Sequence, residues 1–65
     1  MRTFRVSIIG NEVVSCVEDF SLKAYTDVFV QNDKAGNPVF AVIRTASLLN
    51  AVQMAEELLE KGKSD

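Results

Sequence analysis

The sequence contains no histidine and no tryptophan, and it has a single cysteine and a single proline. Without histidine, the side chain that most often transfers protons near neutral pH is missing. Cys16 has no second cysteine with which to form a disulfide inside the chain, and one thiol cannot build a zinc site of the usual thiolate or imidazole type. The sequence therefore predicts neither a cofactor nor a metal site.

Motifs that carry chemistry are also missing from the sequence. It contains no P-loop, no glycine-rich dinucleotide motif and no acidic spacing typical of a calcium loop. Glu18 and Asp19 are adjacent acids, but consecutive side chains of a strand point to opposite faces, so a shared carboxylate site is not expected. Cys16 has apolar neighbours and no histidine to activate it, which favours a packing role. We expect no catalytic residues and conclude that the protein is not an enzyme.

The chain has 65 residues, a length that suits one small α+β domain over residues 1–65. Chains this short often depend on disulfides, a metal or a partner subunit, because a single small core is marginally stable. A partner subunit is the source of extra stability that the composition still allows. The longest apolar runs are well short of about 18 residues and the N-terminus lacks the apolar core of a signal peptide, so we expect a cytoplasmic protein without membrane association.

Two strands joined by a tight turn are predicted for the N-terminal part of the chain. Residues 3–9 alternate between apolar and other side chains, which is typical of a half-buried strand. Gly10-Asn11 indicates a two-residue hairpin loop with glycine at its first central position, so residues 12–19 return as a second strand. In this register Val13 faces Ile8, and a shift of one residue would exchange the two faces. The face away from Ile8 is predicted to carry Arg5, Ser7, Val14, Cys16 and Glu18.

A second pair of strands is predicted over residues 23–31 and 38–44. The turn between them, residues 32–37, contains aspartate, asparagine and glycine, which favour turns. Pairing across this turn is predicted to align Val30 with Val39, Val28 with Ala41 and Thr26 with Ile43. This uncharged set is predicted to face a helix, while the other face mixes aromatic and charged residues. The order of the strands in the sheet stays open beyond the two hairpins.

One amphipathic helix is predicted from residue 48 onward. At about 100° per residue, a single apolar stripe forms, consisting of Leu48, Ala51, Val52, Ala55, Leu58 and Leu59. Ser47 is a suitable N-terminal cap and Gly62 is expected to end the helix. Leu49 and Met54 lie outside the stripe and either fill the edge of the helix against the sheet or contact a partner. The fold class predicted is α+β, order ββββα: a four-stranded antiparallel sheet with one C-terminal helix on one face.

The helix start has a nine-residue pattern, Ser-Leu-x-x-Ala-x-x-x-Ala, carried by Ser47, Leu48, Ala51 and Ala55. This pattern resembles the helix start of several small β–α proteins, including HicB-like antitoxins and small phage-encoded inhibitors of host enzymes. The strand turn with glycine and proline that is expected of HicB-like proteins is not visible in this sequence. The resemblance therefore assigns no family.

The sheet face that the helix leaves uncovered is the predicted site of function. Aromatic and apolar residues with arginines at the rim are typical of protein interfaces, and such a patch is unusual on a monomer. We expect a protein-binding face, with a homodimer as the leading hypothesis and docking of another protein on the same face as the open alternative. The predicted protein-binding residues are Arg5, Val14, Cys16, Tyr25, Phe29, Phe40, Val42 and Arg44.

The same face supports a different hypothesis, in which single-stranded nucleic acid stacks on the aromatic residues and places its phosphates near Arg5, Lys23 and Arg44. Glu18, Asp27 and the net charge of −2 argue against it. Such binding weakens steeply with salt, whereas apolar dimerisation does not. The small size and acidic composition suggest a regulator or inhibitor of another protein, for example one encoded by a phage or plasmid.

Overall fold

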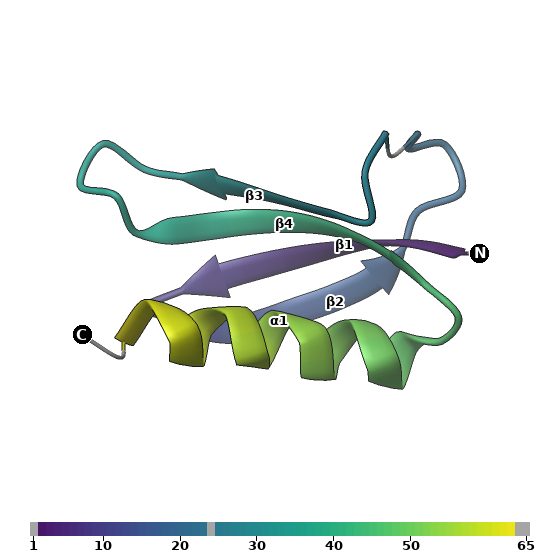
Figure 1. Ribbon diagram of the computed structural model, residues 1–65. Helices are drawn as coiled ribbons and strands as arrows, with labels where there is room; N and C mark the ends of the chain where they lie inside the picture. The colour runs from purple at the N-terminus through teal and green to yellow at the C-terminus, as the bar shows by residue number, and fades with distance from the viewer. Residues whose placement is uncertain (1, 24, 64–65) are drawn as a thin grey trace.

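The computed structural model describes residues 2–23 and 25–63, which form four strands and one helix (Figure 1). The elements are β1 (Arg2–Ile9), β2 (Glu12–Glu18), β3 (Val28–Asn32), β4 (Pro38–Thr45) and α1 (Leu48–Lys63). All neighbouring strands are antiparallel, and their order across the sheet is β2-β1-β4-β3. The predicted ββββα architecture is therefore confirmed, together with both predicted hairpins.

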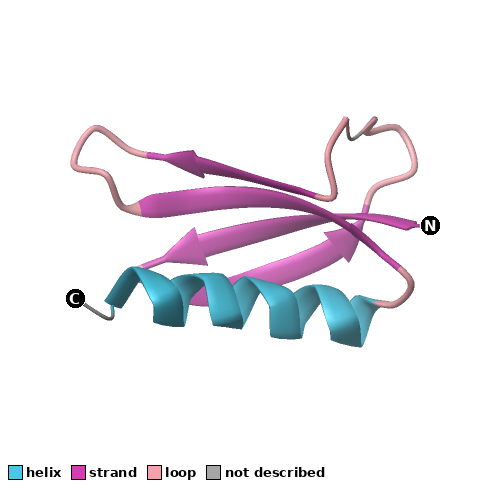
Figure 2. Cartoon of the chain, in the orientation of Figure 1, coloured by secondary structure: helices cyan, strands magenta, loops and turns pink. Residues whose placement is uncertain are grey.

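The core lies between α1 and one face of the sheet (Figure 2). Phe4, Val6 and Ile8 are buried because they occupy alternate positions of the central strand β1 and point toward α1. Central strand β4 adds Ala41 and Ile43 beside them. The helix contributes its buried residues Ala51, Ala55 and Leu59. Within the described residues, no helix is long and apolar enough to cross a membrane.

Helix α1 covers three of the four strands. It packs on β2, β1 and β4 but does not reach across to β3, which lies at the far edge of the sheet (Figure 1). Small residues line the contact, since Ala41 of β4 and Ala51 and Ala55 of α1 are almost completely buried. Side chains of this size allow a helix to approach a sheet closely. The uncovered strand β3 consequently keeps both of its faces partly exposed.

The start of α1 agrees with the prediction and its end does not. The backbone N–H of Asn50 donates to Oγ of Ser47 at 3.2 Å, so Ser47 caps the helix as expected. Gly62 was expected to end the helix, but α1 continues to Lys63, which shows that this glycine lies inside the helical segment. Leu48 is exposed at the first helical position, outside the core that was predicted for it. Met54 packs against the core, whereas Leu49 is 66% exposed.

The β1–β2 hairpin has the predicted two-residue loop, with Ile9 paired to Glu12. Both central residues have positive φ, 60° at Gly10 and 65° at Asn11, which defines a type I′ turn. The predicted turn was the type with glycine at its first central position, in which only that residue has positive φ. The type I′ turn matches the right-handed twist of the two strands. The predicted pairing of Ile8 with Val13 is also confirmed.

A β-bulge in β2 changes the faces predicted beyond that pair. Ser7 pairs with Ser15 while Ile8 pairs with Val13, so Val14 is an extra residue in the ladder. Cys16 therefore lies opposite Val6 and packs against the core on the helix side, and the prediction that it faces away from the helix is wrong. Glu18 moves to the helix side for the same reason, where it pairs with Phe4. Ser15 and Val17 take the positions on the opposite face, where Val17 pairs with Arg5.

The β3–β4 hairpin keeps the predicted faces with a different pairing. Val30 pairs with Ala41 and Val28 with Ile43, a shift of two residues from the predicted register. The shift is even, so the residues that remain paired in the two strands stay on their expected faces. Thr26 and Val39 were predicted to face the helix, but Thr26 lies in the loop before β3 and Val39 is an extra residue in the ladder. A bulge at Val39 and the turn chemistry of Asp33 explain the shift, because the Asp33 carboxylate accepts the N–H groups of Ala35 and Asn37 at 2.9 Å each. Strand β3 also begins later than predicted, at Val28, so Tyr25 belongs to the preceding loop.

Candidate protein-binding face

The sheet surface opposite α1 is called the open face below. The strand pairing places residues of all four strands on it, with Phe29 beside Val42, Gln31 beside Phe40, and Arg5 between Val42 and Val17. The complete set is Thr3, Arg5, Ser7, Ser15, Val17, Phe29, Gln31, Phe40, Val42 and Arg44. Phe29, Phe40 and Val42 form an apolar area over β3 and β4, Arg5 lies in the middle of the face beside Val42, and Arg44 lies nearer the end at which β3 begins.

The loop before β3 folds against the open face and forms an apolar recess with it. The recess has a volume of about 350 Å³ and is lined by Phe29, Phe40 and Val42 from the sheet together with Leu22, Lys23, Tyr25 and Thr26 from the loop. Val42 at its base is only 7% exposed, although no helix covers it. Phe29 at its side is 53% exposed and Tyr25 is 93% exposed. The recess is therefore bordered by two aromatic rings that are still largely in solvent.

The two arginines of the open face, Arg5 and Arg44, each form an ion pair with an aspartate. Nη2 of Arg44 donates to Oδ1 of Asp27 at 3.0 Å, and Nη1 of Arg5 lies 3.7 Å from Oδ2 of Asp19. Surface pairs of this kind contribute little to stability, on the order of 0–1 kcal/mol. They do balance the charges of Arg5 and Arg44, because each arginine has a carboxylate beside it. Nε of Arg44 is buried without a hydrogen-bond partner among the described residues.

Asp19 is further constrained by the loop that follows it. Oγ and the backbone N–H of Ser21 both donate to Oδ1 of Asp19, at 2.7 and 3.0 Å. These bonds lower the pKa of Asp19, with the Ser21 side chain as the largest cause, because they stabilise the charged carboxylate. The loop that forms the recess is thus fixed to the sheet at the position where it leaves β2.

A separate charged group lies on the helix side. Nε and Nη2 of Arg2 donate to the two carboxylate oxygens of Glu18 at 3.0 and 2.6 Å, and the Arg2 guanidinium carbon lies 5.3 Å from the centre of the Phe4 ring. The hydrogen bond to Arg2 lowers the pKa of Glu18 and raises that of Arg2. Burial raises the pKa of the Cys16 thiol, so a smaller fraction of the side chain is present as the reactive thiolate.

The structure brings most of the predicted binding residues together. Arg5, Phe29, Phe40, Val42 and Arg44 share the open face, and Tyr25 reaches the same recess from the loop rather than from a strand. The exceptions are in β2, where Val14 is the extra residue of the bulge and Cys16 is on the helix side. Sequence reasoning missed three contributors, Val17, Leu22 and Thr26. The placement of Val17 depends on the bulge, and that of Leu22 and Thr26 depends on the loop before β3.

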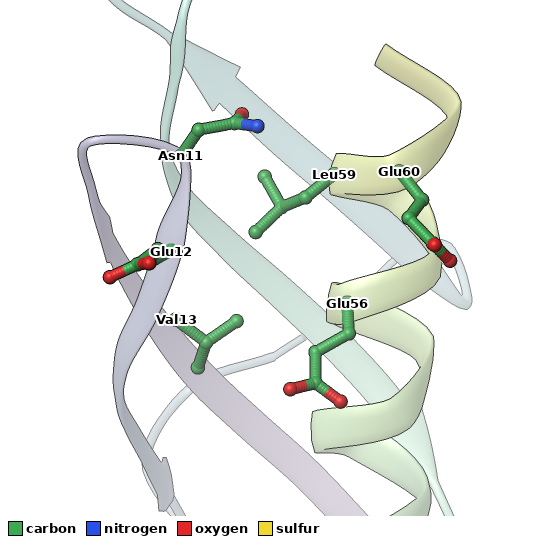
Figure 3. A pocket seen from close by; sticks show the side chains of 6 residues that line it. All are labelled: Asn11, Glu12, Val13, Glu56, Leu59 and Glu60. Carbon is green, nitrogen blue, oxygen red and sulfur yellow. The ribbon is translucent and has the colours of Figure 1, made fainter. Parts of the chain in front are cut away.

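A larger cavity, about 510 Å³, lies elsewhere, between the β1–β2 turn and α1 (Figure 3). Its walls include Glu12 of β2 and Glu56 and Glu60 of the helix. Figure 3 shows the carboxylates of Glu12 and Glu60 directed away from each other, on opposite sides of the cavity. Across residues 2–23 and 25–63, no group of three or more Cys, Asp or Glu side chains is arranged to hold a metal ion. This acidic cavity therefore has no converging set of ligands.

Comparison with known proteins gives no assignment. No family model matches the chain, and neither a curated protein nor a solved structure matches it significantly. The candidate site consequently depends on the geometry of the open face alone.

Proposed function

We propose that the protein is a small, non-enzymatic interaction module that forms a homodimer through its open face and acts as a regulator or inhibitor of another protein. The observation that carries this proposal is the apolar recess beside Phe29 and Tyr25, two aromatic residues left in solvent on the side of the sheet that has no helix. Aromatic residues next to a pocket are the usual anchors of protein interfaces. Burial of apolar surface in a dimer interface contributes roughly 25 cal/mol per Å² to stability. A chain with so small a core benefits from this contribution, because its own core is marginally stable.

The charges of the open face are compatible with a second copy of the same surface. A twofold interface presents the same patch on both subunits, so the patch must be complementary to itself. Arg5 and Arg44 are each paired with an aspartate, Asp19 and Asp27, so the positive charge that these pairs leave on the face comes from Lys23 at the recess. Two copies can therefore approach with little repulsion.

The size of the molecule sets the expected strength of the dimer. The Cα atoms span 32 × 21 × 20 Å. A face bounded by these extents is smaller than the area of about 800 Å² per partner that stable interfaces bury. We therefore expect a reversible dimer rather than an obligate one.

Sedimentation equilibrium of the purified chain at low and high salt tests the proposal. We expect a dimer whose dissociation constant hardly changes with salt, and a folded monomer for Phe29→Asp, because a carboxylate would have to be buried in the interface. Leu49→Asp is the matched control, since Leu49 is also exposed but lies on the helix. A wild-type chain that stays monomeric at every concentration, or equal weakening by both substitutions, would contradict the proposal.

Nucleic-acid binding by the same face is the alternative. It is less well supported, because the two arginines that would meet phosphates, Arg5 and Arg44, already pair with aspartates. A labelled oligothymidine titrated at two salt concentrations separates the two hypotheses. Binding that weakens steeply with salt would favour the alternative.

A further inference from the structure

Strand β3 is the less protected edge of the sheet. The edges are β2 and β3. Strand β2 has a bulge at Val14, a glutamate at each end and α1 packed over it, all of which discourage pairing with another strand. Strand β3 has the sequence Val-Phe-Val-Gln-Asn, without a charged residue or a proline, and the nearby bulge residue belongs to β4. An edge of this kind is a template for an additional strand.

The direction of the β3 backbone groups follows from one hydrogen bond. The N–H of Arg44 donates to the carbonyl oxygen of Asp27 at 2.8 Å, so these residues form a hydrogen-bonded pair. Such pairs alternate along an antiparallel ladder, so the N–H and C=O groups of Val28 and Val30 point away from β4. Oγ1 of Thr26 donates to the Val28 carbonyl oxygen at 3.0 Å, as expected for an outward group. In the part of the chain that the structure describes, the outward groups of Val30 have no partner.

A groove lies beside this edge on the helix side of the sheet. It has a volume of about 290 Å³, and its apolar lining includes Val30, Pro38, Ala41, Leu58 and Leu59. Because α1 does not reach over β3, Val30 is 36% exposed and the groove extends to the edge strand. A strand added next to β3 would direct alternate side chains toward this groove.

We propose that the outer edge of β3 binds an extended, uncharged segment of a partner protein as a fifth strand, with large apolar side chains of that segment entering the groove. Main-chain bonds to Val28 and Val30 supply affinity in this type of recognition, and the groove selects the side chains. The inference rests on the proposed function in one respect, because it takes the chain to be an interaction module and specifies the partner segment.

The shape of the groove favours a partner over a second copy of β3. An antiparallel second copy centred on Val30 would set its Val30 and Val28 opposite Val30 and Asn32, so that two short valine side chains face the groove. Two valine side chains fill less of an apolar volume of about 290 Å³ than longer apolar side chains do. Leucine, methionine or phenylalanine at alternate positions suits the groove better, and this edge is separate from the open face used for dimerisation.

Two capped nonapeptides serve as probes. Each has lysine at both ends and threonine elsewhere, with either leucine or phenylalanine at the fourth and sixth positions, and a third peptide with serine at these positions is the control. Titration into the ¹⁵N-labelled chain, followed by NMR, is expected to shift the amide signals of residues 28–32 and to slow hydrogen exchange of the Val30 amide. The serine peptide is expected to bind at least about tenfold more weakly.

Val30→Pro tests the backbone bond on the protein side. It removes an outward N–H and no bond to β4, and proline is tolerated at such edge positions, so the variant is expected to fold and to bind the peptides roughly tenfold more weakly. Methylation of one alternate set of peptide amide nitrogens is expected to abolish binding, while methylation of the other set is not. Circular dichroism confirms the fold of the variant.

Three results would overturn the inference. They are the absence of shifts up to about 1 mM of either apolar peptide, equal binding by Val30→Pro, and concentration-dependent protection of the Val30 amide without peptide, which would assign the edge to a second copy. Phe29→Asp separates this inference from the proposed dimer. If this variant is monomeric and still binds the peptides, both proposals are supported, and if the wild type is monomeric but binds them, only the dimer fails.

Discussion

At the scale of single residues, the core depends on a small number of side chains. Phe4, Val6 and Ile43 are the largest that are completely buried. Protein interiors are packed at nearly the density of organic crystals, so the loss of one methylene from such a residue lowers the free energy of unfolding. In a chain with 65 residues that loss is a large fraction of the total stability.

Ile43→Val is therefore expected to lower the free energy of unfolding by about 1 kcal/mol, because it removes a buried methylene and leaves a small cavity. Urea denaturation followed by circular dichroism measures the change. Ile9→Val makes the same chemical change at a residue exposed at the end of β1 and is expected to change stability by less than about 0.5 kcal/mol. Equal effects of the two substitutions would mean that Ile43 is not in the core.

A second prediction at this scale concerns acid. A carboxyl group whose pKa is lowered by folding stabilises the folded state above its ordinary pKa, and this stabilisation is lost as the pH falls through the lowered pKa. Ser21→Ala removes the largest cause of the lowered Asp19 pKa, so this pKa should rise toward its ordinary value of 3.8. The decline in stability at acidic pH should also become shallower.

NMR titration of the Asp19 carboxyl carbon measures that pKa directly. Ser15→Ala, at an exposed position of β2, is the control and should leave it unchanged. An Asp19 pKa that does not move in Ser21→Ala would show that the two hydrogen bonds from Ser21 are not formed in solution.

At the scale of elements, the β1–β2 turn depends on backbone conformation. The added Cβ of Gly10→Ala would meet no atom within 4 Å, so its effect is entirely that of an L-residue at a φ of 60°. We expect a loss of about 1–2 kcal/mol in the free energy of unfolding. Asn11→Gly at the neighbouring position should be close to neutral, because glycine adopts this conformation without strain. Urea denaturation of both variants measures the difference, and a neutral Gly10→Ala would be inconsistent with a type I′ turn.

The elements also show how far sequence reasoning reaches. Alternation in residues 3–9 was sufficient to predict β1 and its buried residues, because one face of this strand meets α1 and the other does not. The bulge at Val14 was not predictable, since no glycine marks it and valine fits a regular strand equally well. One inserted residue exchanged the faces of everything after it, which is why Cys16 was assigned to the wrong side.

The candidate site was predictable to the extent that β3 and β4 were. Phe29, Phe40 and Val42 fell on one face in both the predicted and the observed register, because the two registers differ by an even number of residues. The recess was not predictable, because it depends on the loop before β3 folding against the sheet. Tyr25 was expected in a strand, and nothing in the local alternation distinguishes a strand from that loop.

At the scale of the whole molecule, the two faces of the sheet are covered differently. One face of the sheet has the helix and the core, and the other has a loop, a recess and paired charges. If two copies associate through the open face, stability depends on protein concentration, because association favours the folded state by mass action. We expect the melting temperature to rise by several degrees over about a hundredfold increase in concentration.

Differential scanning calorimetry at several concentrations measures this dependence. Phe29→Asp should melt at one temperature throughout, and Leu49→Asp should behave as the wild type. A melting temperature of the wild type that is independent of concentration would indicate that the folded chain is stable without a second copy.

The exposed position of Tyr25 has a practical consequence for such experiments. The chain has one tyrosine and no tryptophan, so Tyr25 is the source of its intrinsic ultraviolet fluorescence. With 93% of its surface in solvent, the phenol has nearly the same surroundings in the folded monomer as in the unfolded chain. Unfolding of the monomer should therefore be almost silent in emission. Occupation of the recess would bring the ring out of water, so a change in its emission reports contact at the open face without any attached dye.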